Sequence, residues 1–191
     1  MHPPALTLGP LARAARFLGR NWARVGYAYH VEPTWLAVTR LTLPVRDLPP
    51  ALAGLTVAHL SDFHCGRHIP AGYLEGAVER AAAARPDLVA LTGDFVDRGP
   101  EHVGRAARLF RHLRAPLGVF AVLGNHDFAV HTARGSRRHP DLDRRVAGAL
   151  EAEGVTVLRN RGVEVGRGGR LVVAGVDDLW SGAADPCAAL G

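Results

Sequence analysis

Apolar and polar positions alternate with two different periods along most of the chain. From residue 55 onward, short apolar runs typical of buried strands are separated by longer stretches in which apolar residues recur at helical spacing. The predicted strands are 55–60, 88–92, 119–123 and 155–158, and the predicted helices are 71–84, 102–113 and 141–153. This order of elements predicts an α/β fold, in which parallel strands are joined by right-handed crossovers and helices cover the sheet.

The segment after the last of these strands has the pattern of a β-hairpin. Two short apolar runs, 163–165 and 171–174, are separated by the glycines Gly166, Gly168 and Gly169. Because glycine accepts the positive φ angles that tight turns need, this stretch is expected to reverse the chain.

The first 54 residues have a different pattern. Arginines recur every three or four residues with apolar side chains between them, which predicts a helix with one basic stripe. The arginines are Arg13, Arg16, Arg20 and Arg24, and the apolar residues are Leu11, Phe17, Leu18 and Trp22. Prolines from Pro33 to Pro50 break any further helix and predict an extended segment. We therefore divide the chain into a basic lead-in, residues 1–54, and a domain, residues 55–191.

The basic helix has two interpretations that the pattern leaves open. It can lie on an anionic membrane surface, where apolar burial and the attraction of arginine to lipid headgroups act together. It can equally dock its apolar face on its own domain. No apolar stretch approaches the roughly 20 residues that cross a membrane, and no signal-peptide pattern follows the first arginines. We therefore expect a cytoplasmic protein, with peripheral contact at the inner face of the membrane if the helix binds lipid.

Composition narrows the class of protein but not its partner. The chain has 191 residues, 48% of them hydrophobic, which is typical of a globular domain and excludes a disordered or collagen-like chain. Its net charge is +5, and all its basic residues other than histidine are arginines, since the sequence contains no lysine. The charge favours anionic partners, although a GC-rich genome also enriches arginine. Two cysteines, Cys65 and Cys187, fit a reduced cytosolic chain better than a disulfide-stapled one.

Polar residues with metal-binding side chains follow each of the first three predicted strands. Asp62 and His64 come after the first strand, two positions apart, so an extended strand end would point both side chains the same way. Asp94 follows the second strand, and Asn125 and His126 follow the third. Because the carboxyl ends of parallel strands meet at one edge of a sheet, we expect these side chains to converge.

The residue types in these three groups suit a divalent cation. Carboxylate, imidazole and amide ligands fit Mn, Fe or Zn better than they fit a soft-metal site. His126 can act as an acid, and Asp127 can orient its imidazole. Asp97 is a further possible ligand, but a loop hydrogen bond or a helix cap is the more ordinary use of such a residue. A turn built from Gly-Asn-His-Asp is the structural alternative for the third group.

Together the three groups resemble the motifs of the calcineurin-like metallophosphoesterases. The matching residues are Asp62-x-His64, Gly93-Asp94-x-x-Asp97 and Gly124-Asn125-His126-Asp127, in this order. The resemblance covers about residues 55–179. It implies a four-layer α/β/β/α sandwich, of which this chain carries the N-terminal portion, with two divalent metal ions over the strand ends.

The resemblance also implies a role for each site residue. Asp62 and His64 would bind the first metal ion, Asp94 would bridge both ions, and Asn125 would bind the second. His126 would act as a general acid or hydrogen-bond the phosphate, aided by Asp127. The implied reaction is hydrolysis of a phosphomonoester or phosphodiester by a hydroxide held between the two metal ions, because metal binding lowers the pKa of water.

Three phrases narrow the resemblance to membrane-associated bacterial members of the family, some of which cleave phospholipid-like or UDP-diacylglucosamine substrates. They are residues 31–33, 48–55 and 174–178. The implied substrate is therefore a phosphorylated small molecule or a phosphorylated lipid. A specific nucleic-acid partner is not expected, because no aromatic-basic pattern or recognised binding fold supports one.

The chain departs from the family pattern in its second half. The later family motifs, one His and then Gly-His-x-His, are missing, so we expect a truncated chain with weak or single-metal binding and a hairpin that lacks neighbouring strands. The other histidines considered as replacement ligands are His102, His112, His131 and His139. They fall in a predicted helix or an arginine-rich loop, where substitution for the missing ligands is not expected. The alternative function is a non-catalytic module that binds a membrane surface or phosphate.

Overall fold

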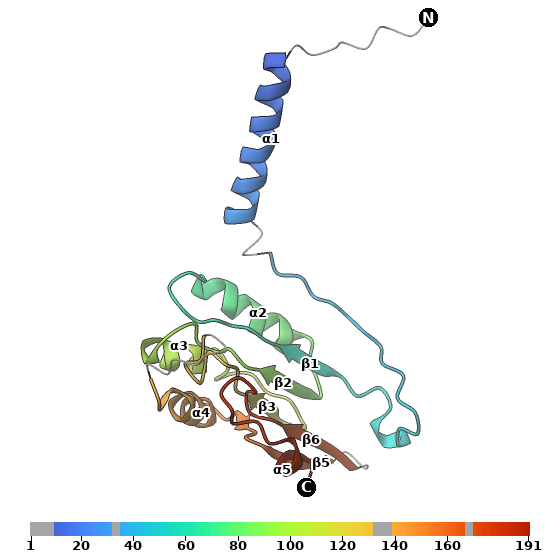
Figure 1. Ribbon diagram of the computed structural model, residues 1–191. Helices are drawn as coiled ribbons and strands as arrows, with labels where there is room; N and C mark the ends of the chain where they lie inside the picture. Colours follow the sequence, from blue (N-terminus) through green and yellow to red (C-terminus); the bar gives the residue numbers. More distant parts are fainter. Residues whose placement is uncertain (1–9, 32–34, 132–138, 167–169) are drawn as a thin grey trace, which may run out of the picture. The chain divides into compact units, whose positions relative to one another are not determined.

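The computed structural model of the chain describes residues 10–31, 35–131, 139–166 and 170–191 (Figure 1). Contacts divide the chain into two compact units, Met1–Arg40 and Leu41–Gly191. This division falls earlier than the boundary at residue 54 that the sequence pattern suggested. The glycines 168 and 169 of the expected hairpin turn lie outside the described residues.

The first unit contains helix α1, Pro10–His30, where the arginine spacing predicted a helix. Apolar side chains on it are exposed, including Phe17, Leu18 and Trp22. Within the described ranges, no helix combines the length and apolarity that crossing a bilayer requires.

The second unit is built around a four-stranded sheet in which all neighbouring strands are parallel. The strands are β1, Val57–Leu60; β2, Leu88–Thr92; β3, Val119–Val122; and β4, Thr156–Val157, and they lie in the order β1-β2-β3-β4. The helices between them are α2, Ala71–Ala83; α3, Val103–Arg108; and α4, Leu142–Ala152. Short 3-10 turns precede β1 and α3 as η2, Pro50–Leu52, and η3, Pro100–His102.

Alternate residues of the central strands face two different cores. On one face of the sheet, Val89, Leu91 and Ala121 pack with buried residues of the helices, among them Leu74 and Val146. This alternation follows from the two-residue period of a strand, since both faces of a parallel sheet must be covered.

The opposite face of the sheet is covered by the hairpin. Strands β5, Arg161–Gly166, and β6, Arg170–Gly175, form an antiparallel two-stranded sheet. Its apolar residues pack with Leu88 and Phe120 of the main sheet and with Leu158, directly after β4; they are Val163, Val165, Leu171 and Val173. The second β layer of the predicted sandwich is therefore present, with no third strand beside the hairpin among the described residues.

A short helix that the sequence pattern did not predict supplies the outermost layer. Helix α5, Pro186–Leu190, packs on β5 and β6, and Asp185 caps it by accepting the Ala188 N–H at 2.9 Å. The approach is close: a Cβ on Gly162 would lie 2.9 Å from the Ala189 carbonyl oxygen. The four layers, helix, sheet, sheet and helix, agree with the predicted α/β/β/α arrangement (Figure 1).

Candidate metal centre

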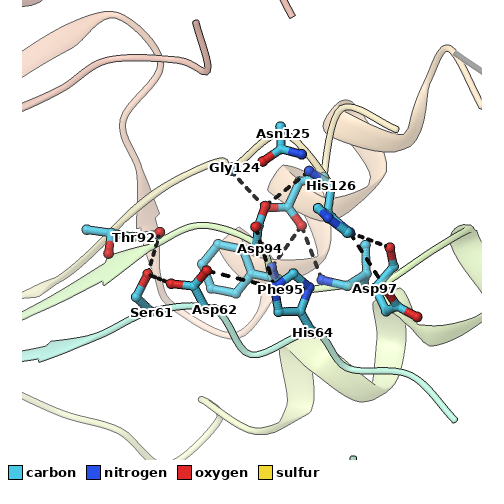
Figure 2. Close-up of polar contacts among 12 residues, drawn as sticks. Ser61, Asp62, His64, Thr92, Asp94, Phe95, Asp97, Gly124, Asn125 and His126 are labelled. Atoms are coloured by element: carbon cyan, nitrogen blue, oxygen red, sulfur yellow. Dashed lines mark hydrogen bonds and ion pairs between the residues drawn. The ribbon is translucent and has the colours of Figure 1, made fainter. Parts of the chain in front are cut away.

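Three loops that follow β1, β2 and β3 build one cluster at the carboxyl edge of the main sheet. Asp62, His64 and Asp94 point toward one another there, and His126 lies beside them (Figure 2). His64 Nε2 is 3.8 Å from Asp62 Oδ1 and 3.6 Å from Asp94 Oδ2. The convergence expected from the strand order is thus confirmed for these residues.

The backbone reaches this arrangement in a different way from the one expected. Strand β1 ends at Leu60, and Asp62 and His64 then adopt left-handed conformations with φ of 57° and 41°. Asp94 does the same with φ of 53°. These side chains therefore converge through turns, not along an extended strand. Left-handed conformations are costly for residues with a Cβ and are typical of functional sites, where surrounding contacts hold them.

Backbone hydrogen bonds join the first loop to the second and hold these conformations in place. The Asp62 N–H donates to the Gly93 carbonyl at 3.2 Å, and the His64 N–H donates to the Asp94 carbonyl at 2.7 Å. The next residue continues the pattern, with the Cys65 N–H 2.9 Å from the Phe95 carbonyl. The backbone at Asp62 and His64 is consequently fixed relative to the loop that carries Asp94.

Asp94 lies at the centre of the cluster and touches all three loops. Its Oδ1 accepts the His126 backbone N–H at 3.0 Å, which leaves Oδ2 facing His64. The third loop passes so close that a Cβ on Gly124 would lie 2.2 Å from Asp94 Oδ1. Only glycine fits at position 124 while Asp94 keeps this orientation.

The His126 ring is held by the second loop. Its Nδ1 is 2.7 Å from the backbone carbonyl of Asp97, so Nδ1 carries the proton that this hydrogen bond needs. The other ring nitrogen, Nε2, is thereby left with a lone pair that can bind a cation; only the doubly protonated ring could donate from Nε2 to a phosphoryl oxygen. The ring also contacts the His64 ring, with centroids 4.6 Å apart. The backbone carbonyl of Asp97 therefore positions the His126 ring. The sequence around Asp97 did not indicate this role.

Asn125 has its amide orientation set by a local contact. Its Nδ2 donates to the Val130 carbonyl at 2.6 Å, which assigns the amide oxygen to the opposite side of the group. That oxygen has no protein donor among the described residues and can serve as a ligand. The orientation is the one that a metal-binding asparagine requires, since only the oxygen has a lone pair to offer.

Asp127 differs from the expectation that it orients the His126 imidazole. Its carboxylate is fully buried, and Oδ1 accepts the backbone N–H groups of Phe95 at 2.9 Å and Val96 at 3.2 Å. Oδ2 accepts the Gly124 N–H at 3.0 Å. Burial raises the pKa of Asp127 to about 7, although the three N–H donors act in the opposite direction. The hydrogen bonds of Asp127 therefore join the second loop to the third. The His126 imidazole is oriented by the Asp97 carbonyl and not by Asp127.

The donor atoms of this cluster fit a divalent cation. One ligand atom from each of His64, Asp94 and His126 lies within 4.8 Å of the others. The separations from His64 to the two carboxylates are too long for hydrogen bonds. They are close to the roughly 3.4 Å that separates two ligands of a tetrahedral ion with bonds of about 2.1 Å. A cation can therefore bind between these groups after modest side-chain movement.

His131 also lies at the cluster, although the sequence analysis placed it in an arginine-rich loop away from the site. The His131 ring contacts the His126 ring, with centroids 4.7 Å apart. Desolvation lowers the pKa of His131, and the neighbouring His126 and Arg98 act in the same direction. No periodic signal could have located it, because it lies in a loop whose path depends on Asn125.

Comparisons with known proteins agree with the motifs. The model of the calcineurin-like phosphoesterase family matches residues 55–190. The chain is 38% identical to the UDP-2,3-diacylglucosamine pyrophosphatase LpxG of Chlamydia trachomatis serovar D over 109 residues. These residues cover 56% of the chain and 33% of LpxG. The chain is 29% identical to the metallophosphoesterase YkuE of Bacillus subtilis over 93% of the chain and 59% of the relative. It is 27% identical to the phosphodiesterase YaeI of Escherichia coli over 84% of the chain and 57% of the relative. The chain thus spans between a third and three fifths of the length of these relatives.

Proposed function

The chain belongs to the calcineurin-like phosphoesterase family, and from this we propose that it hydrolyses phosphate ester bonds with divalent cations bound at the carboxyl edge of its sheet. The observation that carries the proposal is the position of His64 Nε2, 3.8 Å from Asp62 Oδ1 and 3.6 Å from Asp94 Oδ2, with a ring nitrogen of His126 in the same 4.8 Å group as His64 and Asp94. Two carboxylates, an imidazole and an amide oxygen are the donors that Mn, Fe or Zn would accept there.

We assign the residues as follows. Asp62 and His64 would hold one cation, Asn125 would hold a second, and Asp94 would serve both, because its carboxylate lies between the loops. Divalent cations at such a site lower the pKa of water and offset negative charge on phosphoryl oxygens. In its doubly protonated form, with Nδ1–H held by the Asp97 carbonyl, His126 would present Nε2–H toward the leaving group or a phosphoryl oxygen.

The substrate class follows from the charges beside the site and from the relatives. The Arg98 side chain is 78% exposed and its Nε is 3.9 Å from Asp97 Oδ1, so it can reach a phosphate at the edge of the cluster. LpxG is a pyrophosphatase of a diacylated sugar nucleotide and YaeI is a phosphodiesterase. We propose a phosphodiester or diphosphate bond in a phosphorylated small molecule or lipid as the substrate.

Metal dependence tests the hydrolytic proposal. Treatment with EDTA followed by its removal is expected to abolish hydrolysis of bis(p-nitrophenyl) phosphate, and Mn²⁺ or Zn²⁺ is expected to restore it. The release of p-nitrophenol is the measurement. A rate that is the same with and without chelator would contradict the assignment of these residues to a cation.

We also propose that α1 brings the protein to the inner face of the membrane. Phe17, Leu18 and Trp22 are 67%, 57% and 75% exposed on a helix whose sequence carries four arginines. Apolar insertion and arginine attraction then act on the same helix. This helix also favours a second candidate function, a surface-binding module without catalysis.

Vesicle binding tests the membrane proposal. Each arginine near an anionic surface contributes about 1 kcal/mol, so a variant with the four α1 arginines changed to glutamine should lose at least about a hundredfold in partitioning. Co-sedimentation with vesicles containing phosphatidylserine measures this. The matched control changes four exposed arginines of the domain to glutamine: Arg108, Arg111, Arg144 and Arg145. Equal loss in both variants would indicate nonspecific charge attraction. Vesicle binding without metal uptake would favour the non-catalytic module.

A further inference from the structure

His131 extends the row of imidazoles at the cluster by one ring. His64 contacts His126 at a centroid distance of 4.6 Å, and His126 contacts His131 at 4.7 Å, with interplanar angles of 78° and 77°. The described contacts include no hydrogen bond or ion pair that engages the His131 ring nitrogens. Within the part of the chain that the structure describes, the ring therefore has donor capacity beside the cluster that no other group uses.

The position of His131 is set by Asn125. The Val130 N–H donates to the Asn125 carbonyl at 2.8 Å, and the Val130 carbonyl accepts from Asn125 Nδ2 at 2.6 Å. Val130 is buried, and Ala129 before it has a left-handed φ of 56°. A two-sided clamp and a tight turn thus direct the chain so that residue 131 returns to the cluster.

His131 lies on the solvent side of the cluster, where a substrate would enter. It is exposed, whereas His64, Asp94 and His126 are only partly accessible. Arg98 is close to the same side, since its Nε is 3.9 Å from Asp97 Oδ1, and that oxygen is 3.8 Å from His126 Nδ1. An imidazole N–H and a guanidinium group therefore flank the outer side of the cluster, and both bind phosphate oxygens well.

We propose that His131 is a substrate-binding residue that donates a hydrogen bond to a second anionic group of the substrate, next to the phosphoryl group held at the cluster. The inference rests on the proposed function and makes it more specific. A diphosphate would engage both the cluster and His131, whereas a single phosphate would engage the cluster alone.

Equilibrium binding of AMP and ADP tests the proposal, because the two nucleotides differ by one phosphate; ADP is supplied as its α,β-methylene analogue, which has no cleavable diphosphate bond. Isothermal titration calorimetry is performed on the Mn²⁺-loaded chain. The wild type should bind ADP more tightly than AMP. His131→Ala is expected to weaken ADP binding about tenfold and to change AMP binding less than about twofold. His131→Gln keeps an N–H donor and should recover most of the loss.

Two controls separate this role from others. His112→Ala removes an exposed histidine outside the cluster and should leave both affinities unchanged. Mn²⁺ uptake should be equal in the wild type and His131→Ala; reduced uptake would make His131 a metal ligand and overturn the proposal. Equal affinities of the wild type for AMP and ADP, or equal losses for both in the variant, would also overturn it. Binding is measured without turnover, so the two proposals can fail separately. If the chain hydrolyses no phosphate ester but still prefers ADP in a way that depends on His131, the proposed function is refuted and the role of His131 is not.

Discussion

Asp94→Asn is expected to reduce hydrolysis of an aryl phosphodiester by at least about a hundredfold, which corresponds to about 2.7 kcal/mol of transition-state stabilisation. Asp94 Oδ2 is 3.6 Å from His64 Nε2, and Oδ1 accepts the His126 N–H, so this one carboxylate faces the whole cluster. Changes to groups that only support metal ligands typically reduce affinity or activity by about 10 to 100-fold. Loss of the shared carboxylate charge should have a larger effect.

The effect on metal binding is measured separately, by the electron paramagnetic resonance signal of free Mn²⁺. Asp94→Asn should reduce Mn²⁺ uptake together with activity. Asp47→Asn is the matched control, because Asp47 is exposed and has a φ of 56°, close to the 53° of Asp94. Asparagine tolerates this backbone conformation, so both variants should fold. Equal hydrolysis by the wild type and Asp94→Asn would remove the enzymatic assignment.

Asp127→Ala is expected to lower the free energy of unfolding by about 3 kcal/mol. The change leaves the N–H groups of Phe95, Val96 and Gly124 without their acceptor, and each unsatisfied buried donor costs about 1–3 kcal/mol. The burial that raises the pKa of Asp127 offsets part of this loss, because the native carboxylate is itself desolvated. For a domain of this size the expected fall in Tm is about 10 °C.

Thermal and urea unfolding followed by circular dichroism measure the change. Asp127→Asn should be intermediate, because its oxygen can still accept from Phe95 and Val96 while its NH₂ group faces the Gly124 N–H. Glu79→Ala removes an exposed carboxylate on α2 and should change stability by less than about 0.5 kcal/mol. If Asp127→Ala were as stable as Glu79→Ala, the three backbone bonds would not hold the loops together.

Elements with strong boundary signals were predictable from the sequence. The predicted strand 88–92 coincides with β2. The predicted helix 71–84 matches α2 to one residue, because Pro70 and Pro86 limit the two ends of the helical segment. The predicted helix 102–113 was too long. Beyond Arg108 the N–H groups of Leu109 and Phe110 bond three residues back, so the chain tightens into turns without any local breaker.

The site was predictable in its membership but not in its internal contacts. Residue type and position after each strand identified Asp62, His64 and Asp94, because parallel strands end at one edge. The left-handed conformations depend on hydrogen bonds to a neighbouring loop, which no local pattern encodes. Asp127 likewise accepts from Phe95 and Val96, 32 and 31 residues earlier in the chain, so its role became visible only in the folded structure.

The hydrogen bonds between the three loops have a consequence for the domain without its ions. Backbone contacts such as His64 N–H to Asp94 carbonyl, 2.7 Å, join the loops that carry the ligands through main-chain atoms, which a cation would not engage. We therefore expect removal of metal ions to leave this domain folded, unlike small zinc domains that unfold when stripped.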